Sequence, residues 1–144
     1  MDCPFCDEEN INAKLIYKDK LVFVLPTNIP ITPGHTLVCP IRHISKIDDL
    51  TEAESRAVKK VIIKIKNSLK KSFNAEGFNI AWNEGATAGQ SISHLHINIV
   101  PRQAGDAGIY NYEPREFLYR PGSREVSPEK ELILVSQKIK KSLN

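Results

Sequence analysis

The chain has 144 residues, of which 41% are hydrophobic and 26% are charged, a length and composition typical of one compact domain. A chain of this length can bury enough apolar surface to fold without a disulfide framework or a structural metal, so any metal must be argued from its ligands. The net charge of +3 is too small to predict a nucleic-acid or membrane partner. The first residues are acidic and no apolar run approaches the length of a membrane span, so we expect a cytoplasmic protein.

Two of the three cysteines are spaced as Cys3-x-x-Cys6, which fits a reducing compartment and metal or redox chemistry better than structural disulfides. The pair supplies half of a tetrahedral zinc site; the alternative is a pair of exposed, reduced thiols. The third cysteine, Cys39, follows apolar residues and is expected to be a small buried side chain.

Two apolar runs in the first third of the chain predict strands, at residues 21–25 and 35–39. The prolines of the segment between them hold that connection extended and exclude a helix there. These two runs therefore predict neighbouring strands joined by an ordered loop.

A long helix is predicted from about Thr51 to Phe73. Thr51 and Glu54 have the spacing of a capping box, and apolar residues then recur at intervals of three and four. Gly77 is expected to end the helix. The lysines of this helix fall mainly off the apolar stripe, so we expect a solvated face rather than a nucleic-acid site; they are Lys59, Lys60, Lys64, Lys66, Lys70 and Lys71.

The second half of the chain predicts two further strands and a helix. The strands are expected at 78–83 and 93–100, with a loop of small residues, 84–91, between them. Pro101 is expected to stop the second strand. The dipeptide Ser127-Pro128 offers an N-cap and a first-turn proline for a C-terminal helix.

The strand predicted at 93–100 carries a row of polar side chains. Strict alternation sends His94, His96 and Asn98 to one face and the apolar residues between and after them to the other. A buried polar group without a hydrogen-bond partner costs roughly 1–3 kcal/mol. Three in a row therefore favour a common polar ligand or a metal over satisfied positions in a core.

The loop before this strand favours a phosphate ligand. Gly85 and Gly89, with small residues between them, let backbone N–H groups approach an anion, and Gln90 and Ser91 add side-chain donors. It is not a Walker A loop, because no Gly-Lys-Ser/Thr follows and it precedes a strand. Such a loop alone is more often a flexible turn; its place just before His94 is what favours an anion site.

Together these segments resemble a known family. Residues 34–40, Gly-His-Thr-Leu-Val-Cys-Pro, and residues 88–102, Ala-Gly-Gln-Ser-Ile-Ser-His-Leu-His-Ile-Asn-Ile-Val-Pro-Arg, closely resemble the histidine-triad (HIT) family of nucleotide hydrolases and transferases. The resemblance implies an α+β fold, a five-stranded antiparallel half-barrel with one long helix, usually paired into a homodimer. We expect a single HIT domain over 1–144: a core at 1–106 with an N-terminal zinc knuckle, then a loop and a C-terminal helix at 107–144.

The resemblance also implies nucleophilic catalysis at the α-phosphorus of a dinucleoside polyphosphate or a nucleoside phosphoramidate. His96, matching the middle histidine of the motif, would attack through one ring nitrogen and form a nucleotidyl-histidine intermediate, which water or another acceptor then discharges. Imidazole suits this role because it is largely neutral near pH 7 and is also a good leaving group. Its other nitrogen must stay protonated, which in the family is ensured by a backbone carbonyl of the same strand.

Further binding residues follow from the resemblance. Thr27 or Asn28 falls where the family binds the ribose hydroxyls, although the usual acidic residue is absent. His35 resembles the histidine that supports the triad from a neighbouring strand; a purely structural histidine is the alternative. The positions that match phosphate contacts are Asn83, Gly89, Gln90 and Ser91.

Asn98 is the departure from the family pattern, because most hydrolases of the family have a third histidine there. An amide donates a hydrogen bond but carries no proton at pH 7, and general acid–base help is worth roughly 10²- to 10⁴-fold. Relatives with glutamine at this position resemble nucleotidyl transferases and phosphorylases. Besides a hydrolase, the alternatives are therefore a transferase or phosphorylase, and a nucleotide-binding regulatory protein with negligible turnover.

By the same resemblance, His43 and His94 complete a zinc site with Cys3 and Cys6, as in zinc-containing bacterial members of the family. Such a site is structural, and His94 would act by positioning. The alternative has His94 and His96 chelating one metal whose bound water is the nucleophile. Magnesium would enter with the polyphosphate substrate. The segment 108–124, with its tyrosines and arginines, either closes over the substrate or packs as a tail on the dimer.

Overall fold

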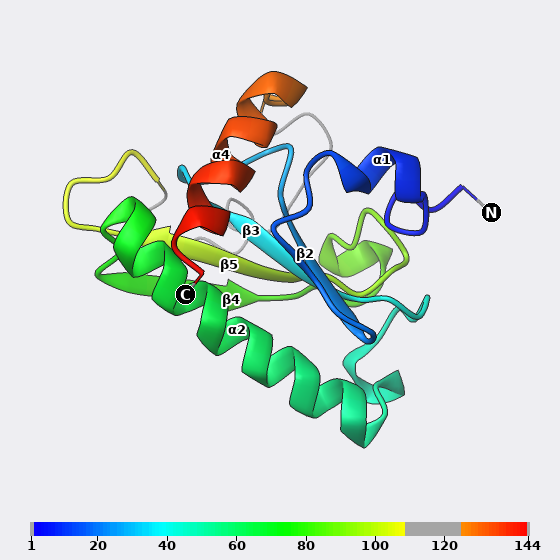
Figure 1. Cartoon of the computed structure of the whole chain (residues 1–144). Helices are drawn as coiled ribbons and strands as arrows, with labels where there is room; N and C mark the ends of the chain where they lie inside the picture. Colours follow the sequence, from blue (N-terminus) through cyan, green and yellow to red (C-terminus); the bar gives the residue numbers. More distant parts are fainter. Residues whose placement is uncertain (1, 109–124, 144) are drawn as a thin grey trace.

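The computed structural model describes residues 2–108 and 125–143, and its centre is one antiparallel sheet of five strands (Figure 1). The spatial order of the strands is β1-β2-β3-β5-β4. The α+β class and the five-stranded antiparallel sheet expected from the sequence are confirmed. The strands are β1 (Tyr17–Lys18), β2 (Val22–Pro26), β3 (Thr36–Pro40), β4 (Gly77–Ala81) and β5 (Ile97–Arg102).

Within the described residues, three α-helices accompany the sheet. The long helix α2 crosses one face of the sheet, and α4 packs against α2 and β2 (Figure 1). No helix of the described part of the chain is both long and apolar enough to cross a membrane. The helices are α1 (Glu8–Asn12), α2 (Glu52–Phe73) and α4 (Glu129–Lys141), and two short 3₁₀ turns are η1 (Ile47–Asp49) and η2 (Ala86–Ala88).

The strands have two buried faces because alternate residues point to opposite sides of the sheet. One face packs against the apolar stripe of α2 and against Ile139 of α4; its strand residues are Val22, Val24, Val38, Ile97 and Ile99. The other face packs against the N-terminal segment; its strand residues are Phe23, Leu25, Leu37 and Cys39. Cys39 is fully buried, as expected. The second face is the one that carries the candidate site.

Helix α2 begins and ends where the sequence predicts, but the residue that ends it is not the expected one. Thr51 and Glu54 form the expected capping box. The last helical residue is Phe73, and the C-cap is Asn74, whose φ of 54° is left-handed. Gly77 instead begins β4, so the prediction that Gly77 ends the helix is wrong. Asparagine tolerates this conformation because its short side chain can bond locally.

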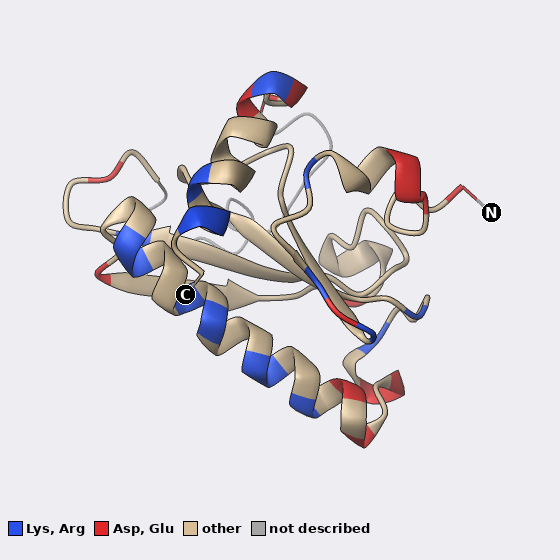
Figure 2. Ribbon diagram, in the orientation of Figure 1, with Lys and Arg blue, Asp and Glu red and all other residues tan. Residues whose placement is uncertain are grey.

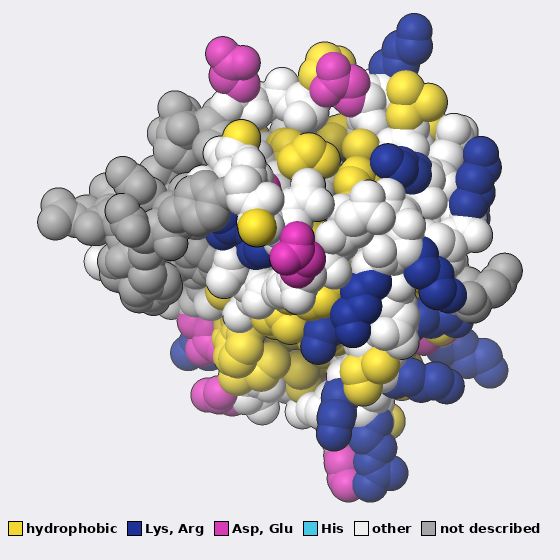
Figure 3. Space-filling view, turned by 90° about the vertical axis from the view of Figure 1, so that its left-hand side faces the viewer, with side chains coloured by type: hydrophobic (Ala, Val, Ile, Leu, Met, Phe, Trp, Pro, Cys, Tyr) yellow, Lys and Arg dark blue, Asp and Glu magenta, His cyan; other side chains and the backbone are white. Residues whose placement is uncertain are grey.

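The lysines of α2 lie on its outer side, and most of them are exposed. Basic side chains follow α2 and the last turns of α4, while acidic side chains gather at the start of α2 (Figure 2). In the view of Figure 3 the basic side chains gather mainly on the right-hand side of the molecule. Acidic first turns and basic last turns complement the helix dipole, which favours a structural role for these charges.

The boundaries of β5 differ from the predicted strand. β5 starts at Ile97, not residue 93, and it runs through Pro101 to Arg102, so the prediction that Pro101 stops it is wrong. Proline fits because Pro101 pairs with Phe78 of β4, whereas the register with β3 ends at Ile99. β4 likewise ends at Ala81, two residues before the predicted end.

Two short elements, α1 and β1, were not predicted, and the N-cap of α4 lies one residue after its predicted position. The Asp7 carboxylate accepts hydrogen bonds from the backbone of Glu9 and Asn10 and so caps α1. Helix α4 begins at Glu129, and its N-cap is Pro128 rather than Ser127. The backbone N–H of Ser127 donates to the carbonyl of Asn28 instead, at 2.7 Å. This bond ties the start of α4 to the loop after β2.

Glu54 is a buried carboxylate whose hydrogen bonds are expected to stabilise the fold. Its carboxylate accepts two bonds of 2.9 Å from Arg42 and one of 2.8 Å from the backbone of Thr51, and these hold its pKa at about 2, below the ordinary 4.5. We expect Glu54→Gln to lower the free energy of unfolding by about 1–2 kcal/mol at pH 7. Since the folded-state pKa is depressed, this contribution is complete above pH 4.5 and is lost as the pH falls through about 2.

Urea unfolding at pH 7 and again near pH 2 measures this difference. The matched control is Glu52→Gln, because the Glu52 carboxylate pairs with Arg56 in solvent and is expected to contribute little. If the two substitutions lowered the free energy of unfolding equally at pH 7, the stabilising role of the Glu54 carboxylate would be contradicted.

Candidate active site

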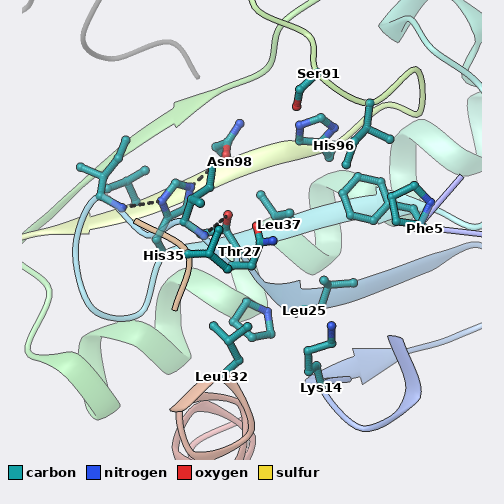
Figure 4. A pocket seen from close by; sticks show the side chains of 18 of the residues that line it. Phe5, Lys14, Leu25, Thr27, His35, Leu37, Ser91, His96, Asn98 and Leu132 are labelled. Carbon is teal, nitrogen blue, oxygen red and sulfur yellow. Dashed lines mark hydrogen bonds between the residues drawn. The ribbon is translucent and has the colours of Figure 1, made fainter. Parts of the chain in front are cut away.

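A pocket of about 380 Å³ opens on the face of the sheet away from α2 (Figure 4). Its floor comes from β2, β3 and β5, and segments far apart in the sequence form its walls. The N-terminal segment contributes Pro4, Phe5, Asn10 and Lys14; the loops contribute Thr27, Asn28, Ile31, Asn83, Ser91 and Ile92; the segment before and within α4 contributes Val126 and Leu132. The predicted residues His35, His96 and Asn98 also line it. The pocket therefore combines an apolar wall with a group of hydrogen-bonding side chains.

His96 lies just before β5, and its ring is held in one tautomer. Its Nδ1 lies 2.8 Å from the carbonyl oxygen of His94. A carbonyl only accepts, so Nδ1 carries the proton and Nε2 keeps its lone pair. Burial lowers the pKa of His96, which favours the neutral ring. A neutral imidazole with a free lone pair is the form required of a nucleophile.

His35 and Asn98 belong to a directed chain of hydrogen bonds. The backbone N–H of Ile31 donates to His35 Nδ1 at 3.1 Å, so His35 Nε2 carries the proton and donates to Asn98 Oδ1 at 2.9 Å. The Nδ2 of Asn98 in turn donates to the carbonyl of Ala81 at 3.1 Å. This chain fixes both the tautomer of His35 and the orientation of the Asn98 amide, as Figure 4 shows for the first two bonds.

Gly34 is required where the chain enters His35. Its φ is +91°, and a Cβ there would meet the ring of Phe73 and the side chain of Pro101 at 3.0–3.2 Å. Packing of α2 and β5 against this turn therefore places His35 at the pocket.

The small-residue loop has the expected glycines, but only part of it reaches the pocket. Gly85 and Gly89 both have positive φ, 87° and 90°. Gln90 fixes the loop through two hydrogen bonds. Its Oε1 accepts from the backbone N–H of Gly85 at 2.7 Å, and its Nε2 donates to the backbone carbonyl of Ser45 at 3.0 Å. Of the predicted phosphate-binding positions, Asn83 and Ser91 line the pocket, whereas Gly89 and Gln90 do not.

His94 points away from the pocket and into a cluster with Cys3, Cys6 and His43. The expected single polar face is therefore wrong for His94. The physical reason is that residues 91–96 precede β5, so strand alternation does not apply to them. His96 and Asn98 alone of the three line the pocket.

The geometry of this cluster fits a zinc ion. The four ligand atoms all lie within 4.8 Å of one another, with Cys6 Sγ 3.3 Å from His43 Nδ1 and Cys3 Sγ 3.5 Å from His94 Nδ1. The Nε2 of His94 donates to the carbonyl of Pro40 at 2.7 Å, so its Nδ1 presents a lone pair to the two sulfurs. Two thiolates and two imidazoles are a zinc donor set, and His96 is not part of it.

Solved structures with this fold include two proteins that are similar over nearly the whole chain. A hypothetical histidine triad nucleotide-binding protein from Sulfolobus tokodaii is 26% identical with a TM-score of 0.78, covering 98% of this chain and 91% of that one. A Zn-bound histidine triad family protein from Mycobacterium smegmatis is 27% identical with a TM-score of 0.76, covering 99% and 94%. Residues 8–105 match the HIT domain family. The chain belongs to the HIT family.

Among sequence relatives in the HIT family, a bis(5'-adenosyl)-triphosphatase from Dictyostelium discoideum is 30% identical over 116 residues, 81% of this chain and 74% of that protein. An AP-4-A phosphorylase from Mycobacterium tuberculosis is 37% identical over 104 residues, 72% of this chain. The matched region is 52% of the phosphorylase, so the chain spans about half the length of that relative.

Several residues that line the pocket were not predicted from the sequence. Phe5 lies between Cys3 and Cys6, which were predicted as metal ligands, and this position is the one feature of the sequence that could have indicated a role for it. Lys14 and Leu132 belong to segments that give no motif. The tyrosines and arginines of 109–124, predicted to close over the substrate or to pack on the dimer, lie outside the described residues.

Proposed function

We propose that this HIT protein is a nucleotide hydrolase that cleaves at the α-phosphorus of a dinucleoside polyphosphate or a nucleoside phosphoramidate. The observation that carries the proposal is His96, whose Nδ1–H is held by a carbonyl while Nε2 is left with its lone pair in a nucleotide-sized pocket. The relatives named for diadenosine compounds support the choice of substrate class.

The proposed reaction has two steps. His96 Nε2 attacks the α-phosphorus, a P–N bond forms, and the bond to the polyphosphate or amine leaving group breaks. The oxygen of a water molecule then attacks the same phosphorus, the P–N bond breaks, its electron pair returns to Nε2, and the proton lost by the water passes to solvent. The His94 carbonyl stabilises the positive charge that develops on the ring in the first step, because it accepts the Nδ1–H.

We assign the nucleotide contacts within the same proposal. Ser91 lies near His96 (Figure 4), and Asn83 also lines the pocket; both supply polar groups for the phosphates. Thr27 and Asn28, on the loop after β2, take the ribose hydroxyls. Phe5, Leu25 and Leu37 offer an apolar surface for the base.

A phosphorylase is the second candidate, and Asn98 favours it. The amide of Asn98 is held between His35 and Ala81 and carries no proton to or from an acceptor, so an acceptor that is already an anion, such as phosphate, competes well with water. The similarity to an AP-4-A phosphorylase supports this alternative. A regulatory protein that binds nucleotides without turnover is the third.

One assay separates the three functions. The protein is incubated with diadenosine tetraphosphate and with adenosine phosphoramidate, each with and without inorganic phosphate, and the products are separated. A hydrolase releases AMP without phosphate; a phosphorylase releases ADP only when phosphate is present. Binding of AMP with no product from any mixture would leave the regulatory function.

We propose a structural zinc ion at Cys3, Cys6, His43 and His94, with any magnesium arriving on the polyphosphate. We expect about one zinc per chain by elemental analysis, loss of the metal in Cys6→Ser, and retention in His96→Ala. The control is Cys39→Ala, because Cys39 is buried in the core and is not in the cluster. Loss of zinc in His96→Ala would instead favour a metal chelated by His94 and His96.

We also propose a homodimer in the cytoplasm. β4 is an edge strand of the sheet, and Ile80 and Trp82 at this edge are 42% and 41% exposed, which a second copy of the chain would cover. The free thiols of the three cysteines fit a reducing compartment.

A further inference from the structure

Phe5 stands at the junction of the metal cluster and the nucleotide pocket. It is one of the two residues between Cys3 and Cys6, it is buried, and its ring forms part of the pocket wall. The ring centroid lies 5.3 Å from that of His96 (Figure 4) and 5.7 Å from that of His94, and both contacts are edge contacts. One side chain thus touches a candidate metal ligand, the candidate nucleophile and the space for the nucleotide.

The backbone on either side of this ring is part of the same junction. The N–H of Cys6 donates to the carbonyl of Cys3 at 3.0 Å, which closes a turn around Phe5. Across the cluster, His94 presents its side chain to the sulfurs and its carbonyl to His96. A metal ion that joins these ligands would therefore fix the turn bearing Phe5 and the carbonyl that orients His96 at once.

We infer that Phe5 is a positioning residue that couples the metal site to the nucleotide pocket, so that metal and nucleotide each increase the affinity of the protein for the other. The inference rests on the proposed function. The metal takes no part in the chemistry; it holds the pocket wall and the His96 ring in the arrangement that binds nucleotide. Linkage requires the effect to be reciprocal, so nucleotide binding tightens metal binding by the same factor.

Phe23 is the control residue for Phe5, because it packs on the same metal cluster. Its ring centroid lies 6.4 Å from that of His94 and 6.5 Å from that of Phe5, so it packs on the same cluster. Phe23 is not among the residues that line the pocket. Loss of ring packing at Phe23 therefore affects the cluster without touching the nucleotide, whereas the same change at Phe5 affects both.

The test measures metal affinity rather than turnover. The holoprotein is titrated with a chromogenic zinc chelator, with and without saturating AMP, for wild type, Phe5→Leu and Phe23→Leu, and circular dichroism checks that each variant is folded. We expect AMP to tighten zinc binding by about 10-fold in wild type and in Phe23→Leu, and by less than about 2-fold in Phe5→Leu.

Equal zinc affinity with and without AMP in wild type would overturn the coupling, even if the variants did not fold. Should that wild-type protein still bind AMP and turn over diadenosine tetraphosphate, only the coupling fails and the proposed function stands. Should it neither bind AMP nor turn over any substrate, both fail. An equal loss of coupling in Phe23→Leu and Phe5→Leu would overturn the role given to Phe5.

Discussion

Replacement of His96 by alanine is expected to lower the turnover of diadenosine tetraphosphate by roughly 10³- to 10⁶-fold, as is usual when a covalent nucleophile is removed. His96 Nε2 is the nitrogen with a free lone pair that the geometry aims at the pocket, because Nδ1 is held by the carbonyl of His94. Initial rates from product separation give the turnover, and AMP affinity measured separately shows whether the pocket is intact.

The control for this prediction is His96→Gln, which keeps a hydrogen-bond donor but offers no imidazole nitrogen. We expect it to be as inactive as alanine while AMP binds within a few-fold of wild type. Substantial turnover in either variant would exclude His96 as the nucleophile.

Replacement of Asn98 by histidine is expected to raise the turnover of adenosine phosphoramidate by roughly 10²-fold or more. An amine leaves poorly unless it is protonated, and Asn98 cannot supply that proton. A histidine at 98 could still accept the Nε2–H of His35, and its other nitrogen would be able to carry a proton. Wild type should accordingly favour the polyphosphate, whose leaving group departs as an anion.

The informative quantity is the ratio of kcat/KM for adenosine phosphoramidate to that for diadenosine tetraphosphate, in wild type and Asn98→His. Asn98→Gln serves as the control, because it keeps the amide and should leave the ratio near the wild-type value. An unchanged ratio in Asn98→His would show that proton transfer at this position does not limit the reaction.

The sequence predicted the helix and strands that are determined by neighbouring residues in the chain. The capping box at Thr51 and the apolar periodicity after it place α2 correctly, and the apolar runs around β2 and β3 place these strands within a residue. The five-stranded antiparallel sheet was expected only from the family resemblance, and the order of its strands was not predicted, since pairing between distant segments has no local signature.

The parts that could not be predicted depend on contacts between distant segments. Strand alternation put His94 on the wrong face, and only the family resemblance placed it with the cysteines. It turns toward them because residues 91–96 are not yet in β5, and the carbonyl of Pro40 holds its ring there. Gln90 holds its own loop instead of reaching the pocket. Phe5 and Leu132 reach the pocket only through the packing of the two ends of the chain around it.

The central claim is that His96 carries the nucleotidyl group during turnover. The most direct measurement mixes the protein with excess diadenosine tetraphosphate, quenches in alkali, where a P–N bond to histidine survives, and determines the mass of the intact protein and of its peptides. The account predicts an increase equal to one adenylyl group, located on His96 and missing from His96→Ala. Turnover without any adduct, or an adduct on another residue, would contradict it.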